Sequence, residues 1–185
     1  NTQDITVNIT NVNDVATEFT SRASLSGDEN QTSIGTVTAT DVEGDDITFT
    51  VSGSELEITA AGVLTFAASP DYETETSYSA TVTATDGINF ATQDITVQVI
   101  NLNDNDPVFT SSATLNGDEN QTEIATITAT DADGDTVTFT ISGSDLAITT
   151  DGVLTFVSPP DYESIQSFAA VITASDSERT TNQSI

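Results

Sequence analysis

The sequence predicts an all-β protein made of two tandem seven-stranded antiparallel Greek-key β-sandwiches. Three observations support this fold class. A block of about 90 residues occurs twice, apolar and hydroxyl side chains alternate within it, and turns rich in Gly and Asp separate the alternating runs. Because 185 residues also suit two small domains, each block is expected to form its own sandwich.

The repeat is visible when the sequence is compared with itself at a shift of 90 residues. The matching segments are Asp28–Thr32 and Asp118–Thr122, Thr38–Asp41 and Thr128–Asp131, Pro70–Glu73 and Pro160–Glu163, and Gln3–Val7 and Gln93–Val97. The chain therefore holds two copies of one module, and its first residues match the last strand of such a module.

In chain order, residues 1–10 are expected to be the last strand of a preceding repeat or a donor strand, and residues 11–15 a linker. Residues 16–100 form the first module, residues 101–105 the second linker, and residues 106–185 the second module. The second module lacks most of its last strand, because Gln183–Ile185 align with Gln93–Ile95.

Alternation with a period of two marks the strands within each module. The odd positions of residues 47–51 and 95–99 are Ile, Phe or Val, and Thr or Gln lies between them. This pattern indicates strands with one face in a core and the other in water. β-Branched Thr favours the extended backbone, so it suits the solvent face.

The composition excludes several kinds of chemistry. The chain has 30 Asp and Glu against two cationic residues, Arg22 and Arg179, a formal charge of −28, and no His or Cys. Disulfides, Ser-His and Ser-Lys nucleophiles, and zinc bound by His or Cys are therefore excluded. So negative a chain also repels phosphate groups and anionic lipids. We expect no enzyme, no nucleic-acid partner and no direct membrane contact.

The acids cluster in short motifs at strand ends and in loops. In the second module these are Glu119-Asn120, Asp131-Ala132-Asp133, Asp161-Tyr162-Glu163 and Ala174-Ser175-Asp176, preceded by the linker Asn103-Asp104-Asn105-Asp106-Pro107. This order resembles the cadherin repeat, with its Pro-Glu-Asn, Asp-X-Asp, Asp-X-Glu and Ala-X-Asp motifs and its Asp-X-Asn-Asp-Asn-X-Pro linker. The modules look like short bacterial cadherin-like repeats, and the resemblance covers both of them. It implies a cadherin or immunoglobulin-like sandwich.

The resemblance also implies calcium (Ca²⁺) at each junction between successive modules. At the second linker it implies the ligands Glu29, Asp71 and Glu73 from the upstream module, Leu102, Asn103, Asp104 and Asn105 from the linker, and Asp131, Asp133 and Asp176 from the downstream module. The matching residues are Asn13, Asp14, Asp41, Glu43 and Asp86 at the first linker, and Glu119, Asp161 and Glu163 at the end of the second module. Their carboxylate and carbonyl oxygens are the donors that calcium takes in shells of about six to eight.

A physical argument leads independently to a cation. Carboxylates that converge on the second linker would repel each other by about 3 kcal/mol per pair, at roughly 5 Å and an effective dielectric constant near 20. The junction motifs contain neither Lys nor Arg. The junction is therefore either open and flexible or closed by multivalent cations.

Other interpretations of the acids fit less well. A salt-tolerant, solvated surface would place acids on the exposed strand positions, where Thr, Ser and Gln lie instead. An EF-hand starting at Asp131 would need Glu at its twelfth position, which is Ser142. A glycosidase pair at Asp71 and Glu73 is disfavoured because the same pair recurs in the second module.

We therefore expect a calcium-rigidified extracellular spacer, stalk or fibre module of a bacterial adhesin on the cell surface. Its partners would be neighbouring repeats of the same chain or like chains. The alternative is an adhesive module that binds carbohydrate or an identical repeat on another cell.

The first residues suggest a further expectation. Thr2–Thr10 repeats the strand that the second module lacks, with Ile5, Val7 and Ile9 at the apolar positions. If this segment added to the second module of a like chain, copies would join head to tail in a filament. The other interpretation is a frayed first segment.

Overall fold

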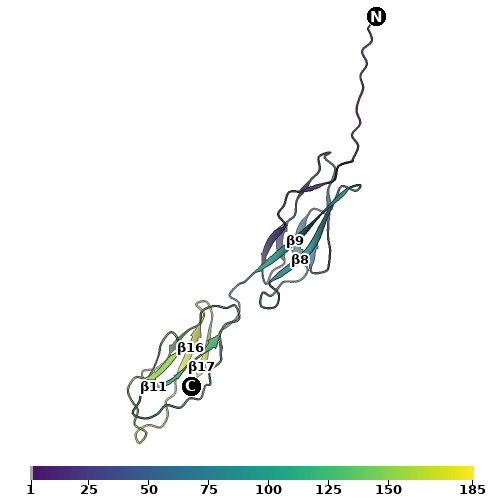
Figure 1. Ribbon diagram of the computed structural model, residues 1–185. Coiled ribbons are helices and arrows are strands. Elements are labelled where there is room, and N and C mark those ends of the chain that lie inside the picture. Colours follow the sequence, from purple (N-terminus) through teal and green to yellow (C-terminus); the bar gives the residue numbers. More distant parts are fainter. Residues whose placement is uncertain (1) are drawn as a thin grey trace. The chain divides into compact units, whose positions relative to one another are not determined.

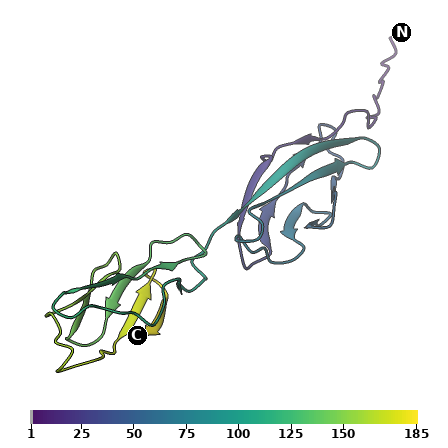
Figure 2. The ribbon, with the colours of Figure 1, turned by 60° about the horizontal axis from the view of Figure 1, so that its bottom comes forward.

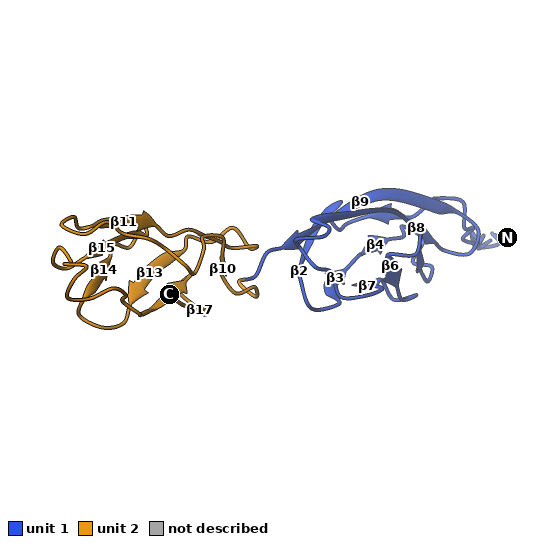
Figure 3. Cartoon of the chain, turned by 90° about the horizontal axis from the view of Figure 1, so that it is seen from below, with its two compact units in different colours: residues 1–102 blue, residues 103–185 orange. Residues whose placement is uncertain are grey.

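A computed structural model describes residues 2–185 as two compact units, Asn1–Leu102 (unit 1) and Asn103–Ile185 (unit 2) (Figure 3). Asn1, the first residue of the expected donor strand, lies outside the described residues. The regular elements in the described part are all strands, which confirms the predicted all-β class. Among residues 2–185 there is no helix long and apolar enough to cross a membrane.

Unit 1 contains the seven predicted strands, with the first and second each interrupted once. In the described part of the unit the segments are β1 (Glu18–Phe19), β2 (Ser24–Asp28), β3 (Ser33–Thr36), β4 (Ala39–Thr40), β5 (Thr48–Val51), β6 (Leu56–Ile58), β7 (Val63–Phe66), β8 (Ser77–Thr85) and β9 (Phe90–Ile100). One layer has the strand order β2-β9-β8-β5, and the other combines β3-β7-β6 with the pair β1-β4. The long β8–β9 hairpin dominates the first layer (Figure 1).

One strand pair departs from the predicted antiparallel arrangement. Strands β2 and β9 run parallel, from Ser24 opposite Thr96 to Asp28 opposite Ile100. The reason is that the first strand changes layer without reversing direction. Its β1 part pairs with β4 and its β2 part pairs with β9, so that β2 and β9 both run toward Leu102.

The core of unit 1 lies between the two layers and follows the period-two pattern. Its buried side chains include Leu64 and Phe66 from one layer and Val82, Ile95 and Val97 from the other, each at most 2% exposed. Burying side chains of this size contributes about 1.5–3 kcal/mol each. The alternation in the sequence therefore corresponds to the main source of stability.

Unit 2 repeats the sandwich with fewer strands. Its segments within residues 103–185 are β10 (Val108–Phe109), β11 (Glu123–Thr126), β12 (Ala129–Thr130), β13 (Thr138–Ile141), β14 (Leu146–Ile148), β15 (Val153–Phe156), β16 (Val171–Ser175) and β17 (Thr180–Ser184). Residues 114–118, which match β2, form no strand, and β16 has five residues where β8 has nine. Both losses have one cause, since in unit 1 these segments pair with residues 95–100, whose full counterpart residues 103–185 do not contain.

The segment before the first sandwich forms no strand in the described chain. Residues 2–12 form no strand, and the start of the chain runs out from unit 1 as an extended segment (Figure 2). Ile5, Val7 and Ile9 are 79%, 82% and 95% exposed. The segment thus has the alternating pattern of a strand but pairs with no sheet in the described chain.

Candidate metal centre

The loop after β4 folds around a single carboxylate. Oδ1 of Asp41 accepts hydrogen bonds from the backbone N–H groups of Glu43, Gly44 and Asp45 at 2.8, 3.0 and 3.3 Å. Its other oxygen, Oδ2, is buried and has no hydrogen-bond partner within residues 2–185. A buried acceptor without a partner costs about 1–3 kcal/mol, and more when it is charged. The loop therefore presents one desolvated oxygen that lacks a donor.

The loop after β12 repeats this arrangement in unit 2. Oδ1 of Asp131 accepts hydrogen bonds from the N–H groups of Asp133 and Asp135 at 3.0 and 3.3 Å. Oδ2 of Asp131 is buried, again without a hydrogen-bond partner in the described chain. Carboxylate oxygens of Asp131, Asp133 and Asp135 lie within 4.8 Å of one another.

The turns after β8 and β16 each hold a second carboxylate of the same kind. Oδ1 of Asp86 accepts from the N–H groups of Ile88 and Asn89 at 2.8 and 2.7 Å, and Oδ1 of Asp176 accepts from Glu178 and Arg179 at 2.8 and 2.7 Å. The hydrogen bond from the Ile88 N–H lowers the pKa of Asp86 most, and that from the Arg179 N–H lowers the pKa of Asp176 most. Both groups are therefore anionic at neutral pH.

The remaining oxygens of these two carboxylates are also buried. Oδ2 of Asp86 and Oδ2 of Asp176 have no hydrogen-bond partner among the residues that the structure describes. Asp176 as a whole is only 4% exposed. Each unit thus has two carboxylates of one kind, which we call half-satisfied: one oxygen accepts backbone hydrogen bonds, and the other is buried without a hydrogen-bond partner in the described chain.

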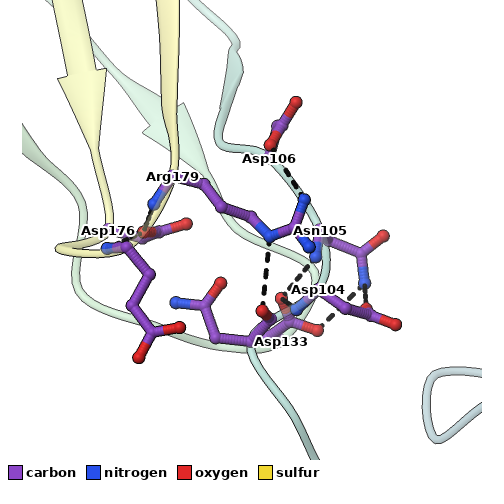
Figure 4. A network of polar contacts seen from close by, with 8 residues as sticks. Asp104, Asn105, Asp106, Asp133, Asp176 and Arg179 are labelled. Carbon is purple, nitrogen blue, oxygen red and sulfur yellow. Dashed lines mark hydrogen bonds and ion pairs between the residues drawn. The ribbon is translucent and has the colours of Figure 1, made fainter. Parts of the chain in front are cut away.

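Figure 4 shows how the linker reaches these groups in unit 2. The N–H groups of Asp104 and Asn105 donate to Oδ2 of Asp133 at 3.1 and 2.9 Å. The Asn105 amide donates to Oδ1 of Asp104 at 2.8 Å and to Oδ1 of Asp133 at 2.9 Å. Oδ1 of Asn103 is buried without a hydrogen-bond partner in the described residues. The linker thereby adds amide and carboxylate oxygens to the loops of the same unit.

Arg179 holds the other side of this linker. Its Nε donates to the backbone carbonyl of Asn103 at 3.3 Å, and Nη1 pairs with Asp106 at 3.5 Å. In unit 1 the matching residue is Asn89, whose amide donates to Oδ1 of Asn13 at 2.7 Å. The N–H groups of Asp14 and Val15 donate to the Glu43 carboxylate at 3.1 and 3.2 Å. The first linker thus docks on unit 1 as the second docks on unit 2.

The opposite end of unit 1, where the chain leaves at Leu102, carries a second group of acids. Glu29 is 1% exposed, and its carboxylate accepts from the N–H groups of Leu102 at 2.7 Å and Tyr72 at 2.8 Å. Carboxylate oxygens of Glu29 and Glu73 lie within 4.8 Å of each other. Asp71 lies beside them in the chain, and its pKa is lowered mainly by the hydrogen bond from the Thr74 hydroxyl.

Unit 2 carries the same group in a more open form. Oxygens of Glu119, Asp161 and Glu163 lie within 4.8 Å of one another, and all three residues are exposed. Glu119 accepts from the Tyr162 N–H at 3.2 Å. The residues matching Leu102, which would donate the second hydrogen bond, fall outside residues 103–185. Residues 103–185 therefore supply one of the two backbone hydrogen bonds that hold the matching carboxylate, Glu29, in unit 1.

The donor set fits a hard divalent cation. The groups are carboxylate and amide oxygens, which calcium prefers and which soft metals bind less well. Four buried carboxylate oxygens, on Asp41, Asp86, Asp131 and Asp176, have no hydrogen-bond partner in residues 2–185 and are therefore suited to bind a cation. The residues present therefore fit calcium.

The structure arranges the predicted ligands in separate groups within each unit. Unit 1 gathers Asn13, Asp14, Asp41, Glu43 and Asp86 near the first linker and Glu29, Asp71 and Glu73 at the Leu102 end; unit 2 gathers Asn103, Asp104, Asn105, Asp131, Asp133 and Asp176 near the second linker, and Glu119, Asp161 and Glu163 apart from them. The sequence analysis missed Asp45, Asp135, Asn89 and Arg179. The Asp-Gly-Asp pattern that follows Asp131 in the sequence offered a signal for Asp135, whereas neither Asn89 nor Arg179 belongs to an acidic motif.

The fold and these loops define a pair of tandem cadherin-like modules. The chain is similar to Protocadherin Fat 4 of Homo sapiens, at 33% identity over 141 residues, which covers 66% of this chain and 3% of that protein. Its structure resembles a crystal structure of mouse cadherin-23 EC22-24, with a TM-score of 0.78 and 21% identity, over 92% of this chain and 65% of the other. It also resembles human protocadherin-24 EC1-2, with a TM-score of 0.71 and 20% identity, over 92% and 93% of the two chains. No protein-family model matches the chain.

These likenesses confirm the predicted cadherin-like sandwich fold. The chain spans a small fraction of the curated relative that it matches, so that the role of the whole protein stays a matter for proposal. The expected bacterial origin likewise stays a prediction.

Proposed function

We propose that the chain is a non-enzymatic spacer of an extracellular protein and that calcium stiffens the junctions between its modules. The observation that carries the proposal is the recurring half-satisfied carboxylate. In Asp41, Asp86, Asp131 and Asp176 backbone N–H groups fix one oxygen, and the other is buried without a hydrogen-bond partner in the described chain. A fold that repeats so costly an arrangement at matching positions is best explained by cations, bound separately in each unit by these oxygens.

Calcium fits these oxygens better than magnesium. It accepts about six to eight oxygen ligands in flexible geometry, whereas magnesium requires a near-ideal octahedron and gives up its water reluctantly. The oxygens here come from loop carboxylates and from linker amides. Such a mixed set favours the larger ion.

The position of the ligand groups supports a role at the junction. Glu29 binds the backbone N–H of Leu102 at the end of unit 1, and Asp133 binds the N–H of Asp104 at the start of unit 2. Leu102 and Asp104 are separated in the chain by one residue, Asn103. We infer that the group at the end of unit 1 and the group at the start of unit 2 share calcium ions that neither could saturate alone.

The mechanical consequence follows from charge. With a net charge of −28 and two arginines, acids brought to one junction repel each other unless a cation lies between them. Calcium would then hold successive modules in line, and its removal would free them. Extracellular modules bind calcium at about 0.1–1 mM, so the sites would fill outside a cell. We infer that the parent protein is a surface adhesin or fibre. The short repeats favour a bacterial origin.

Calorimetric titration of the full chain with CaCl₂, together with thermal unfolding in CaCl₂, MgCl₂ and EDTA, tests the proposal. Calcium should bind and raise the melting temperature, while equal magnesium should have little effect. The double variant Asp131→Asn with Asp176→Asn should lose the calcium binding of unit 2 while that of Asp41 and Asp86 in unit 1 remains. The matched variant Asp145→Asn with Asp151→Asn, which removes the same charge from exposed turns, should keep both. Equal calcium binding by both variants would contradict the proposed site.

A further inference from the structure

The two linkers are held by different residues at one matching position. In unit 2 this position is Arg179, in the turn before β17 (Figure 4), and in unit 1 it is Asn89. A second exchange accompanies the first, because Asp106, which forms the ion pair with Arg179, is replaced in unit 1 by Ala16. The units therefore differ in how a side chain from this turn meets the linker.

Arg179 and Asp133 hold one peptide group of the second linker from opposite sides. The Nε of Arg179 donates to the carbonyl of Asn103 at 3.3 Å. The N–H of Asp104, which belongs to the same peptide group, donates to Asp133 at 3.1 Å. The carbonyl and the N–H of a trans peptide group point in opposite directions. Contacts within unit 2 therefore fix the orientation of this peptide group.

In unit 1 the shorter side chain of Asn89 binds a different atom of the linker. Its amide donates to the side-chain oxygen Oδ1 of Asn13 at 2.7 Å. Asn13 matches Asn103, and Oδ1 of Asn103 is buried without a hydrogen-bond partner in the part of the chain that the structure describes. An amide thus caps this oxygen in unit 1, whereas in unit 2 Arg179 binds the backbone and leaves the oxygen uncapped.

The uncapped oxygen belongs to a side chain that contacts a half-satisfied carboxylate. The Arg179 N–H lowers the pKa of Asp176 most, and a hydrogen bond from the Asn103 side chain lowers it further. Oδ2 of Asp176 is likewise buried without a hydrogen-bond partner among residues 2–185. Unit 2 therefore offers a cation two free acceptors, from Asn103 and Asp176. At the matching place unit 1 offers Oδ2 of Asp86 and a capped Asn13.

We propose that Arg179 is a positioning residue that keeps the side-chain oxygen of Asn103 available to a divalent cation. It binds the backbone of Asn103 and does not supply the amide that caps Asn13 in unit 1. The ligand group at the second linker should therefore bind calcium more tightly than the group at the first. Residues that orient metal ligands from outside the coordination shell typically contribute about 10–100-fold in affinity. This inference rests on the proposed calcium function, whereas the hold of Arg179 on the linker peptide does not.

The positive charge of Arg179 acts in the opposite direction, because it repels a cation. The ion pair with Asp106, at 3.5 Å, offsets this repulsion. The two side chains are 41% and 61% exposed, so that water and salt screen the remaining charge. The positioning of Asn103 should therefore outweigh the charge of Arg179.

Amide hydrogen exchange of the full chain in EDTA tests the hold on the linker. We expect the N–H of Asp104 to exchange faster in Arg179→Ala than in the parent chain. The matched control is Arg22→Asn, which removes the other cationic residue from an exposed position in unit 1 and should leave this exchange unchanged. Equal exchange of Asp104 in the parent chain and in Arg179→Ala would overturn the hold.

Calorimetric titration with CaCl₂ tests the difference between the two linkers. The background Asp41→Asn with Asp86→Asn removes the half-satisfied carboxylates of unit 1 and leaves those of unit 2. It should bind calcium more tightly than the reciprocal variant Asp131→Asn with Asp176→Asn, which leaves those of unit 1. Equal affinities of these two variants would overturn the predicted difference.

Substitutions of Arg179 in the first of these backgrounds separate position from charge. We expect Arg179→Asn to lower the calcium affinity about tenfold or more, because the new amide would cap Asn103 as Asn89 caps Asn13. Arg179→Ala removes the same charge without adding an amide, so it should lose less affinity than Arg179→Asn. The control Arg22→Asn should bind like the background.

The outcomes distinguish this inference from the proposed function. Equal affinities of Arg179→Ala and Arg179→Asn would overturn the capping of Asn103. Tighter binding by either variant than by the background would show that charge repulsion dominates and would overturn the positioning role. A parent chain that binds no calcium would overturn the proposed function and the role of Asn103 with it, while the exchange of Asp104 in EDTA would still decide whether Arg179 holds the linker.

Discussion

At the scale of single residues, the main finding is a carboxylate that the backbone satisfies on one side only. The loop N–H groups orient Asp86 and Asp176 and lower the pKa of both, chiefly through Ile88 and Arg179. Each side chain is thereby held ionised, with its second oxygen buried. Backbone geometry thus positions these two carboxylates without the help of an ion.

Replacing one such ligand should separate metal binding from folding. In EDTA we expect Asp176→Asn to lower the melting temperature only slightly, by weakening the hydrogen bonds from the Glu178 and Arg179 N–H groups that favour the ionised carboxylate. In calcium at a hundredfold excess over its dissociation constant, loss of one site should remove about 2.7 kcal/mol of stabilisation. The control is Asp151→Asn, on an exposed turn of the same unit. A loss of stability in EDTA equal to that in calcium would contradict a metal role for Asp176.

Tyr78 gives unit 1 a pH dependence that unit 2 lacks. Burial raises the pKa of Tyr78 above its ordinary value of 10.0, with smaller contributions from the charges of Glu75, Glu55 and Asp71. The folded unit therefore favours the neutral phenol. The resulting stability is present below pH 10 and is lost as the pH rises through the raised pKa.

Thermal unfolding above pH 10 and the ultraviolet absorbance of tyrosinate should reveal this group. We expect Tyr78→Phe to remove the alkaline loss of stability in unit 1 and the last of the tyrosinate transitions. Unit 2 is an internal control, because Phe168 occupies the matching position. A difference in absorbance between the parent and Tyr78→Phe that develops at pH 10 and not above it would show that the pKa of Tyr78 is not raised.

At the scale of elements, alternation predicted the strands well because burial imposes it on every half-buried strand. Residues 48–51 and 95–99 lie in strands, and their apolar side chains belong to the core or pack against it. The parallel pairing of β2 with β9 was not predictable in this way, because both directions give the same alternation. Pairing direction depends on where the chain changes layer, and no local pattern in residues 20–23 reveals that change.

The candidate site was likewise predictable from the sequence only in part. The acidic motifs identified the ligand candidates because their order in the sequence is distinctive. The contacts of Arg179 with the Asn103 carbonyl and with Asp106 were not predictable, since these residues are more than 70 positions apart. Such contacts depend on the register of the β16–β17 hairpin, which brings Arg179 to the linker.

The turn before β7 requires glycine for two reasons that can be separated. Gly62 has φ of +86°, and a Cβ there would collide with the carbonyl oxygen of Val37. Gly53 has φ of +83° but no atom near the position of a Cβ. We expect Gly53→Ala to cost about 1–2 kcal/mol from the left-handed backbone alone, and Gly62→Ala to cost clearly more.

Urea unfolding of the two alanine variants measures the difference. Gly152 repeats the geometry in unit 2, with φ of +91° and the Ile127 carbonyl in the place of a Cβ, so Gly152→Ala should behave like Gly62→Ala. Equal costs at Gly53 and Gly62 would mean that the turn shifts to relieve the collision.

At the scale of the whole molecule, the two modules show one sequence pattern in two states of completeness. The segments Ser24–Asp28 and Ser77–Ala80 are strands in unit 1. Their counterparts, residues 114–118 and 167–170, keep the alternating pattern but are not strands within unit 2. Local propensity is similar in the two copies, so it is the partner strand that decides whether these segments join the sheet.

The junction itself can be tested through a residue that lies outside both cores. Glu73 is exposed and lies within 4.8 Å of Glu29 at the Leu102 end of unit 1, so Glu73→Ala should leave the melting temperature in EDTA unchanged. If Glu73 shares calcium with the second linker, the variant should need more calcium than the parent chain to become rigid. Small-angle scattering at submillimolar calcium should then show a broader distribution of dimensions for Glu73→Ala, close to that of the parent in EDTA. Asp104→Ala should behave alike, whereas Glu57→Ala, which removes a charge from the exposed face of β6, should scatter like the parent. Profiles of Glu73→Ala and Glu57→Ala that coincide at every calcium concentration would remove Glu73 from the junction.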